Sequence, residues 1–440
     1  MYVPRVIEPH IKSSLKGRFI TTILGPRRVG KTSLVKHLTT QLANINLCEL
    51  NLDSLQIRER INKLELHQLI EENCLQKIGG EQKLWVTIDE AQKCPALFEQ
   101  IKLIYDEWKD TDKIKFVLTG SAHLSLHQLS AETLAGRIEL FYLQPFTLRE
   151  MSRLDTEALP IKSLLDLISD TEPQQLPDIL NNAIQELLPF KPLLQQNLRD
   201  SLIWGGLPEV AASEPNQAIK QRYLYNYIDT YLEQDIRKIE TITDLNLYKN
   251  LMDIVAQQTG SLRDDTKTLS ALGCGRDTLK KYRGYLLATL MYLEIFPYIG
   301  ATLNKLVKSP KAYMLDNGII SNLTGIYDVN VLINTGAIGH RFENWFLQEL
   351  RAWLEQSSVR NEIYFLRLSS GTEIDFVVVK RPFVYPFEVT FGVPAERKKM
   401  NNLIKFLQDS PNIPWGFYIY NGEFKVDHSK KIIFIPAWCI

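Results

Sequence analysis

The sequence has few cysteines, no excess of either charge and no long apolar run. The five cysteines are scattered and without C-x-x-C spacing, which argues against a disulfide framework or a zinc site and favours reduced thiols. Lys plus Arg and Asp plus Glu number 51 each, so any nucleic-acid contact has to come from a local patch. No apolar run reaches the roughly 18 residues of a membrane span, and the residues after Met1 do not resemble a signal peptide. We therefore expect a cytoplasmic protein without a membrane partner.

The composition is that of a globular protein, with 45% hydrophobic and 23% charged residues, which excludes a mostly disordered or fibrous chain. At roughly 150 residues per domain, the length indicates about three domains. In the first third, short β-rich runs alternate with helical patterns, and the runs around Trp85 and Phe116 are almost continuously apolar. Such strands are covered on both faces, so the pattern predicts an α/β fold with a parallel sheet. We expect its strands at Phe19–Leu24, Leu47–Leu52, Leu84–Ile88 and Lys115–Thr119.

A glycine-rich segment follows the first predicted strand and precedes a helical pattern. It fits G-x-x-x-x-G-K-[ST] at every position, as Gly25-Pro26-Arg27-Arg28-Val29-Gly30-Lys31-Thr32, with Ser33 next in the helix. Glycines let backbone N–H groups turn inward around phosphates, and the helix start adds partial positive charge. Lys31 would meet the β- and γ-phosphates, and Thr32 would offer its hydroxyl to Mg²⁺. The alternative is a chance glycine turn before a helix.

A phosphate loop predicts an acidic residue at the end of another buried strand, and Asp89 and Glu90 follow Leu84–Ile88. Asp89 would hold Mg²⁺, and Glu90 would orient or deprotonate the attacking water. A polar residue is also expected from the strand between these two, and either Thr119 or Ser121 could lie near the γ-phosphate. The alternative is a strand end capped by solvated acids.

Together with Leu134-Ala135-Gly136-Arg137, these motifs resemble the AAA-superfamily ATPases of prokaryotes that carry a C-terminal domain of unknown function. The resemblance covers nearly the whole chain and extends to the turn Trp204-Gly205-Gly206-Leu207-Pro208-Glu209. It implies ATP and Mg²⁺ as cofactors, hydrolysis that drives a conformational change, and an AAA-like P-loop ATPase core at residues 1–150. It also makes Arg137 a candidate arginine finger, in its own subunit or toward a neighbour in a homo-oligomer. The alternative for Arg137 is a structural pair with Glu132 or Glu139.

The middle of the chain is predicted to be mostly helical. Residues 151–215 carry several prolines between short helical pieces, which indicates a helical lid or connector and not a compact core. Within residues 216–325, the segment Leu269–Tyr282 reads as helix, turn, helix, and wing strands are expected at Leu293–Pro297 and Lys311–Leu315. This winged helix would present Arg276, Lys280 and Arg283 on one face, with Lys281 alongside, to DNA or a protein partner. The alternative is a solvated basic face.

Residues 326–440 return to strands with interleaved helices, and Glu343, Asp375 and Glu388 fall where this small α/β domain resembles a restriction-endonuclease-like core. Such acids would bind Mg²⁺ beside a lysine that helps to activate water. Here Thr390 stands in the lysine position, so Lys398 is considered as a substitute and Glu373 as a fourth acid. A retained fold with vestigial acids is the preferred interpretation.

A second pair of candidate ligands, His123 and His127, has the i, i+4 spacing that can serve zinc but no third ligand nearby, which favours a surface pair. The function hypothesis for the whole chain is a Mg²⁺-dependent ATPase. An NTP-dependent DNA nuclease and a slow, nucleotide-controlled switch that binds DNA or protein are the alternatives.

Overall fold

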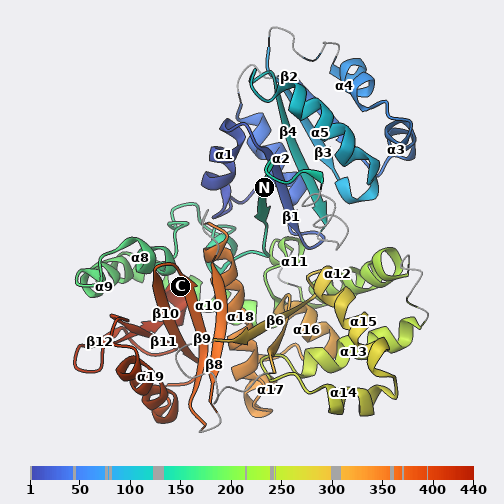
Figure 1. Cartoon of the computed structure of the whole chain (residues 1–440). Coiled ribbons are helices and arrows are strands. Elements are labelled where there is room, and N and C mark those ends of the chain that lie inside the picture. The colour runs from blue at the N-terminus through green and yellow to red at the C-terminus, as the bar shows by residue number, and fades with distance from the viewer. Residues whose placement is uncertain are drawn as a thin grey trace. The chain divides into compact units, whose positions relative to one another are not determined.

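The computed structural model divides the chain into two compact units (Figure 1). The first comprises residues 1–144 with 288–290, and the second comprises residues 145–287 with 291–440. The structure describes residues 2–42, 46–74, 78, 82–121, 133–213, 216–237, 242, 244–298, 309–356, 361–368, 371–393 and 395–440. His123, His127 and Glu132 lie outside these residues. Every helix in the described ranges is too short or too polar to span a bilayer.

The first unit is built on a fully parallel sheet with the strand order β2-β3-β4-β1-β5. The prediction of an α/β fold with a parallel sheet is confirmed, and a fifth strand that the sequence pattern did not indicate, β5, extends one edge. All six residues of β1 are buried, as expected for a strand covered on both faces. The strands are β1 (Ile20–Gly25), β2 (Asn46–Asn51), β3 (Leu84–Asp89), β4 (Ile114–Ser121) and β5 (Ile138–Tyr142). The helices are α1 (Glu8–Lys16), α2 (Lys31–Thr40), α3 (Leu55–Asn62), α4 (Leu66–Cys74), the 3-10 turn η1 (Ala91–Lys93) and α5 (Ala96–Trp108).

The second unit contains a mixed sheet with the order β12-β13-β11-β10-β9-β8-β6-β7. Strands β6 and β7 come from the predicted middle region, and β6 pairs in parallel with β8, so one sheet runs across the expected boundary at residue 325. The strands are β6 (Tyr292–Pro297), β7 (Lys311–Met314), β8 (Glu362–Arg367), β9 (Glu373–Lys380), β10 (Phe383–Thr390), β11 (Gly416–Tyr420), β12 (Lys425–Asp427) and β13 (Ile432–Pro436).

Helices of the second unit surround this sheet and form the middle region (Figure 1). They are α7 (Leu148–Ser152), α8 (Leu164–Asp170), α9 (Leu176–Leu187), α10 (Lys191–Trp204), α11 (Pro208–Ala211), α12 (Gln217–Tyr231), α13 (Leu245–Gln257), α14 (Asp265–Leu272), α15 (Arg276–Ala288), α16 (Asn317–Thr324), α17 (Val329–Asn334), α18 (Ile338–Leu354) and α19 (Arg397–Asp409).

The proline-bearing stretch after residue 151 does not form a separate lid or connector. Leu165 and Leu180 are buried in the same apolar cluster as Phe346 and Phe387 of the C-terminal domain. Pro177 and Pro192 occupy the first turns of α9 and α10, and Pro189 lies at the start of the 3-10 turn between these helices. A proline there loses no helical hydrogen bond and has the φ that a helix start requires, so it begins a helix instead of interrupting one. The prediction of a region outside the core was wrong for this reason.

The middle region has the element order of a winged helix. After α13 come a β-bridge between Leu262 and Lys311, helices α14 and α15, and the antiparallel pair β6 and β7. The expected basic face is smaller than predicted, because Arg283 is buried and donates to Asp265 across 2.7 Å. Arg276, Lys280 and Lys281 remain exposed.

Candidate functional site

The phosphate loop lies between the end of β1 and the start of α2, as its motif predicts. Gly30 has a φ of 95° at the N-cap of α2, and a Cβ atom on Gly25 would lie 2.4 Å from the Leu143 carbonyl oxygen, so both positions require glycine. The Lys31 ammonium is buried and donates to the carbonyl oxygens of Gly25 (3.1 Å) and Pro26 (2.7 Å). Two carbonyl groups of the loop therefore hold the Lys31 ammonium in place.

A hydroxyl–carboxylate constellation adjoins this loop. Thr32 Oγ1 donates to Asp89 Oδ2 across 2.8 Å, and Thr119 Oγ1 contacts the other carboxylate oxygen, Oδ1. The three residues come from α2, β3 and β4, and they line a pocket of about 170 Å³. Mg²⁺ prefers oxygen ligands and usually takes one or two protein groups, with phosphates and water completing its shell. The Thr32 hydroxyl and the Asp89 carboxylate fit that requirement.

The Glu90 carboxylate, next to Asp89 in the sequence, is held by a neighbouring side chain. Glu90 has a φ of 57° and its Oε2 accepts a hydrogen bond from Gln92 Nε2. Of the two candidates from β4, Thr119 contacts Asp89, whereas the Ser121 hydroxyl is buried without a hydrogen-bond partner among the described residues. The structure thus places the Thr119 hydroxyl against the Asp89 carboxylate and leaves Glu90 hydrogen-bonded to Gln92.

Arg5, a residue outside the motif, supports the phosphate loop. The Arg5 guanidinium is buried and donates to the carbonyl oxygens of Val29 (2.9 Å) and Gln144 (2.6 Å). It thereby joins the loop to the segment that follows β5. No motif signals Arg5, because it lies 20 residues before the loop. Within the loop, Pro26 and Val29 are buried, while Arg28, in the left-handed region with a φ of 60°, is exposed, as is Ser33 in α2.

Arg137 lies at the opposite edge of the sheet from the phosphate loop. Its carbonyl oxygen accepts from the N–H of Ile20, where β1 begins, whereas the loop follows the end of this six-residue strand, about 20 Å away. Its guanidinium makes two bonds to Asp106, of 2.9 and 2.8 Å, and this pair lowers the pKa of Asp106. The observed partner is Asp106 and not the expected Glu139, while Glu132, the other expected partner, lies outside the described residues. Arg137 therefore cannot approach a γ-phosphate in its own subunit.

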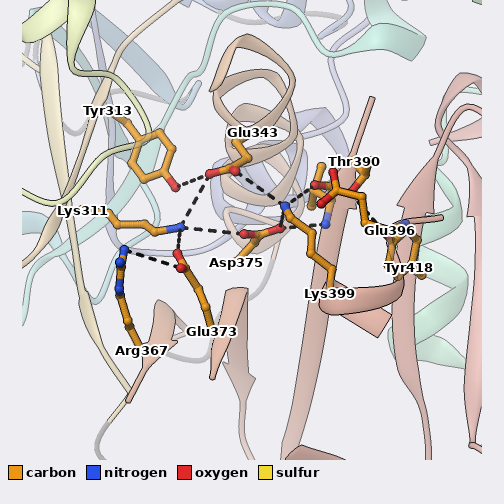
Figure 2. Close-up of polar contacts among 11 residues, drawn as sticks. Lys311, Tyr313, Glu343, Arg367, Glu373, Asp375, Thr390, Glu396, Lys399 and Tyr418 are labelled. Atoms are coloured by element: carbon orange, nitrogen blue, oxygen red, sulfur yellow. Dashed lines mark hydrogen bonds and ion pairs between the residues drawn. The ribbon is translucent and has the colours of Figure 1, made fainter. Parts of the chain in front are cut away.

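The predicted acids of the second unit, Glu343, Asp375 and Glu388, do come together, around a pocket of about 320 Å³. Figure 2 shows Glu343 and Asp375 in this cluster. The missing lysine is supplied by α19. Lys399, and not Lys398, donates to Asp375 Oδ2 (2.6 Å) and to the carbonyl oxygen of Val389 (2.7 Å). The Thr390 hydroxyl instead pairs with that of Tyr418 at 3.0 Å.

A second lysine, which the sequence did not mark, enters the cluster from β7. Lys311 Nζ lies 2.9 Å from Glu373, 3.6 Å from Glu343 and 3.8 Å from Asp375, and Figure 2 shows it opposite Lys399. Among the described residues, no three His, Cys, Asp or Glu side chains are arranged to hold a metal ion. The predicted metal site of Glu343, Asp375 and Glu388 is therefore not formed in this conformation, because lysine ammonium groups lie among these carboxylates.

Charge and burial act in opposite directions in this cluster. Burial disfavours the charged form of Asp375, but Lys399 and Lys311 hold its pKa down at about 2. Burial opposes the charged form of Lys311 too, yet the surrounding carboxylates raise its pKa well above the usual range. For Glu388, burial and the nearby Asp375 charge both raise the pKa. Burial also raises the pKa of Glu343. The cluster is thus a set of lysine–carboxylate pairs that adjoins the Glu388 carboxyl group, whose pKa is raised well above its usual value.

Family models of known proteins match this chain in three consecutive regions. Residues 17–152 match a family model described as an AAA domain, and residues 195–330 and 338–440 match two domains of unknown function, DUF8612 and DUF4143. Uncharacterized proteins of Mycobacterium bovis and Mycobacterium tuberculosis are each 23% identical over 419 residues, covering 95% of this chain and 80% of theirs.

Solved structures show more distant likenesses. A Walker-type ATPase of Pyrococcus abyssi has a TM-score of 0.42 at 16% identity, covering 73% of this chain and 96% of that one. The ORC1 protein of Aeropyrum pernix, in complex with DNA, has a TM-score of 0.29 at 12% identity, covering 76% of this chain and 95% of that one. The parallel sheet, the phosphate loop and the match to the AAA domain model give the first unit the fold of an AAA-type P-loop ATPase.

Proposed function

We propose that the chain binds ATP with Mg²⁺ at the phosphate loop and hydrolyses it, and that turnover drives a conformational change. The observation that carries this proposal is the contact of Thr32 and Thr119 with the two carboxylate oxygens of Asp89, next to Lys31. Three elements separated in sequence converge on one carboxylate at the mouth of the loop. A chance glycine turn would not bring these groups together.

Each side chain has a definite task in this reaction. Thr32 and Asp89 would hold the magnesium ion, whose charge would stabilise the negative charge that develops on the phosphates. Lys31 transfers its hydrogen bonds from the carbonyls of Gly25 and Pro26 to the β- and γ-phosphates. Glu90, once released by Gln92, orients the attacking water and accepts its proton. Arg137 would contribute only across a contact with a second copy of the chain.

Replacement of the loop lysine tests nucleotide binding. Lys31→Ala is expected to weaken MgATP binding about 10- to 100-fold, because a charged hydrogen-bond donor to phosphate contributes roughly 1.5–3 kcal/mol. Isothermal titration of MgATP into the full chain measures this. Lys16→Ala, an exposed lysine on α1, serves as the control and should bind as the wild type does. Unchanged affinity in folded Lys31→Ala would remove the phosphate loop from the proposal, and tight binding without any turnover in the wild type would favour a nucleotide-controlled switch.

The C-terminal cluster leads to a separate expectation about DNA. With Lys311 among its carboxylates, the second unit is expected to leave plasmid DNA intact in the presence of Mg²⁺ or Mn²⁺, which agrees with the interpretation of vestigial acids. Agarose-gel assays of the wild type and of Asp375→Ala and Asp409→Ala measure this, Asp409 being an exposed acid on α19. Metal-dependent cleavage by the wild type and by Asp409→Ala, but not by Asp375→Ala, would show a nuclease instead.

A further inference from the structure

In the second unit, the Lys311 ammonium lies among carboxylate groups. Three carboxylates, from Glu343, Glu373 and Asp375, have oxygen atoms within 3.8 Å of the Lys311 ammonium. Several carboxylate oxygens around one positive centre is the environment that hard divalent cations take. Lys311 is only 3% exposed, so its ammonium is a fixed part of the interior.

An independent observation shows that this pocket has ligand capacity that Lys311 does not use. Glu388 is 1% exposed, and within the described part of the chain no N–H or hydroxyl donor meets its carboxylate oxygens. Its hydrogen-bonding neighbour is the Asp375 carboxylate, so this contact requires a shared proton. Glu388 lines the same pocket of about 320 Å³ as Lys311 and Asp375. A buried carboxyl group without a donor is costly, and a proton or a cation at this place would satisfy it.

Lys311 is fixed in this position by its backbone. In β7 it is paired with Ile295 of β6 on one side and forms a bridge with Leu262 on the other. Two residues along the same strand, Tyr313 donates to Glu343 Oε2 across 3.3 Å (Figure 2). Strand β7 lies within residues 195–330, whereas the carboxylates lie within residues 338–440, so one family region supplies the cation and the other supplies the acids.

We propose that the cluster is a divalent-cation site whose cation position is taken by Lys311, so that this lysine and a metal ion exclude each other. The charges support this reading. The carboxylates of Glu343, Glu373 and Asp375 carry three negative charges, and Lys311, Lys399 and Arg367 carry three positive ones. Loss of the Lys311 charge leaves one buried negative charge uncompensated, and a divalent ion can supply what is missing.

The test measures Mn²⁺ binding to the full chain, without nucleotide, by electron paramagnetic resonance. Lys311→Met is expected to bind Mn²⁺ at least about tenfold more tightly than the wild type. Its affinity for Mn²⁺ should lie in the range of weak protein calcium sites. Its thermal midpoint should rise with added Mn²⁺, whereas that of the wild type should not. Arg367→Met is the matched control, because it removes a cation that contacts Glu373 at 3.5 Å but leaves Lys311 in place. Any binding at the phosphate loop is common to all variants and cancels in the comparison.

A charge-neutral pair of variants decides the outcome if Lys311→Met does not fold. Lys311→Met/Glu373→Gln loses one charge of each sign, and Glu373→Gln alone keeps the lysine. Binding in the double variant but not in Glu373→Gln would support the proposal. The proposal is overturned if the wild type binds Mn²⁺ as tightly as Lys311→Met, or if Arg367→Met gains binding to the same degree. It is also overturned if no folded variant that lacks Lys311 binds Mn²⁺ more tightly than the matching protein that keeps this lysine.

Discussion

Glu90→Gln is expected to bind MgATP with the affinity of the wild type and to hydrolyse it on the order of 10³-fold more slowly, within the usual contribution of a general base. The amide matches the carboxylate in size, so Thr32, Asp89 and Lys31 keep their contacts and the nucleotide keeps its binding groups. What is lost is the capacity to accept a proton from water. A phosphate-release assay at saturating ATP measures turnover, and calorimetry measures affinity.

The control for this variant is Glu107→Gln, an exposed acid on α5 that should not change turnover. Hydrolysis by Glu90→Gln at the wild-type rate would remove Glu90 from its assigned role and require another group to position the water. A simultaneous loss of ATP affinity would indicate that Glu90 acts in binding. The contact with Gln92 is relevant here, because the carboxylate has to leave its amide partner before it can face water.

The ATPase core was predictable because its signals are local in sequence. A strand, a glycine loop and a helix start follow each other within residues 20–40, and each obeys a short-range rule. Asp89 could be found because parallel strands end at one edge of a sheet, so a carboxylate after another buried strand has to lie near the loop. Thr119 and Ser121 differ only in which way each side chain points, and the sequence left that choice open.

The supporting residues could not be predicted, because they act across long separations. Arg5 joins Val29 to Gln144, a carbonyl 139 residues away. Lys311 precedes its carboxylate partners by 32 to 64 residues and lies in a strand expected to be a wing. Nothing in the sequence around these residues differs from that around an ordinary surface lysine or arginine. Tertiary pairing alone gives them their roles.

The turn at Gly205 and Gly206 shows the same limit. Its sequence indicated a tight turn without chemistry. In the structure the Gly206 N–H donates to the buried Asp316 carboxylate across 2.6 Å, and the Gly206 carbonyl accepts from Phe146 across 2.7 Å. The prediction of a turn agrees with the structure, but the hydrogen bonds that the turn makes depend on partners 60 and 110 residues away.

The stability of the second unit is expected to fall as pH rises through neutrality, because Glu349 of α18 is buried. Its Oε1 accepts from the N–H of Leu148 across 2.7 Å, and burial raises the pKa of Glu349 to about 8. In the unfolded chain the same group has an ordinary pKa of about 4.5. Between these values the folded state holds a proton that the unfolded state releases. Stability therefore decreases with increasing pH, by about 1.4 kcal/mol per pH unit and on the order of 5 kcal/mol in total.

Glu349→Gln should remove this contribution, since the amide keeps an acceptor for Leu148 and carries no charge at any pH. We expect little change at pH 5 and a gain of several kcal/mol at pH 8. Hydrogen–deuterium exchange of α18 peptides in the full chain, corrected for the intrinsic exchange rate at each pH, gives the opening free energy. Glu186→Gln, exposed on α9, should keep the wild-type slope. Part of the slope will remain in Glu349→Gln, because Glu388 also has a raised pKa. An unchanged slope in Glu349→Gln would mean that Glu349 is ionised in the folded protein and compensated by a nearby cation such as Arg149.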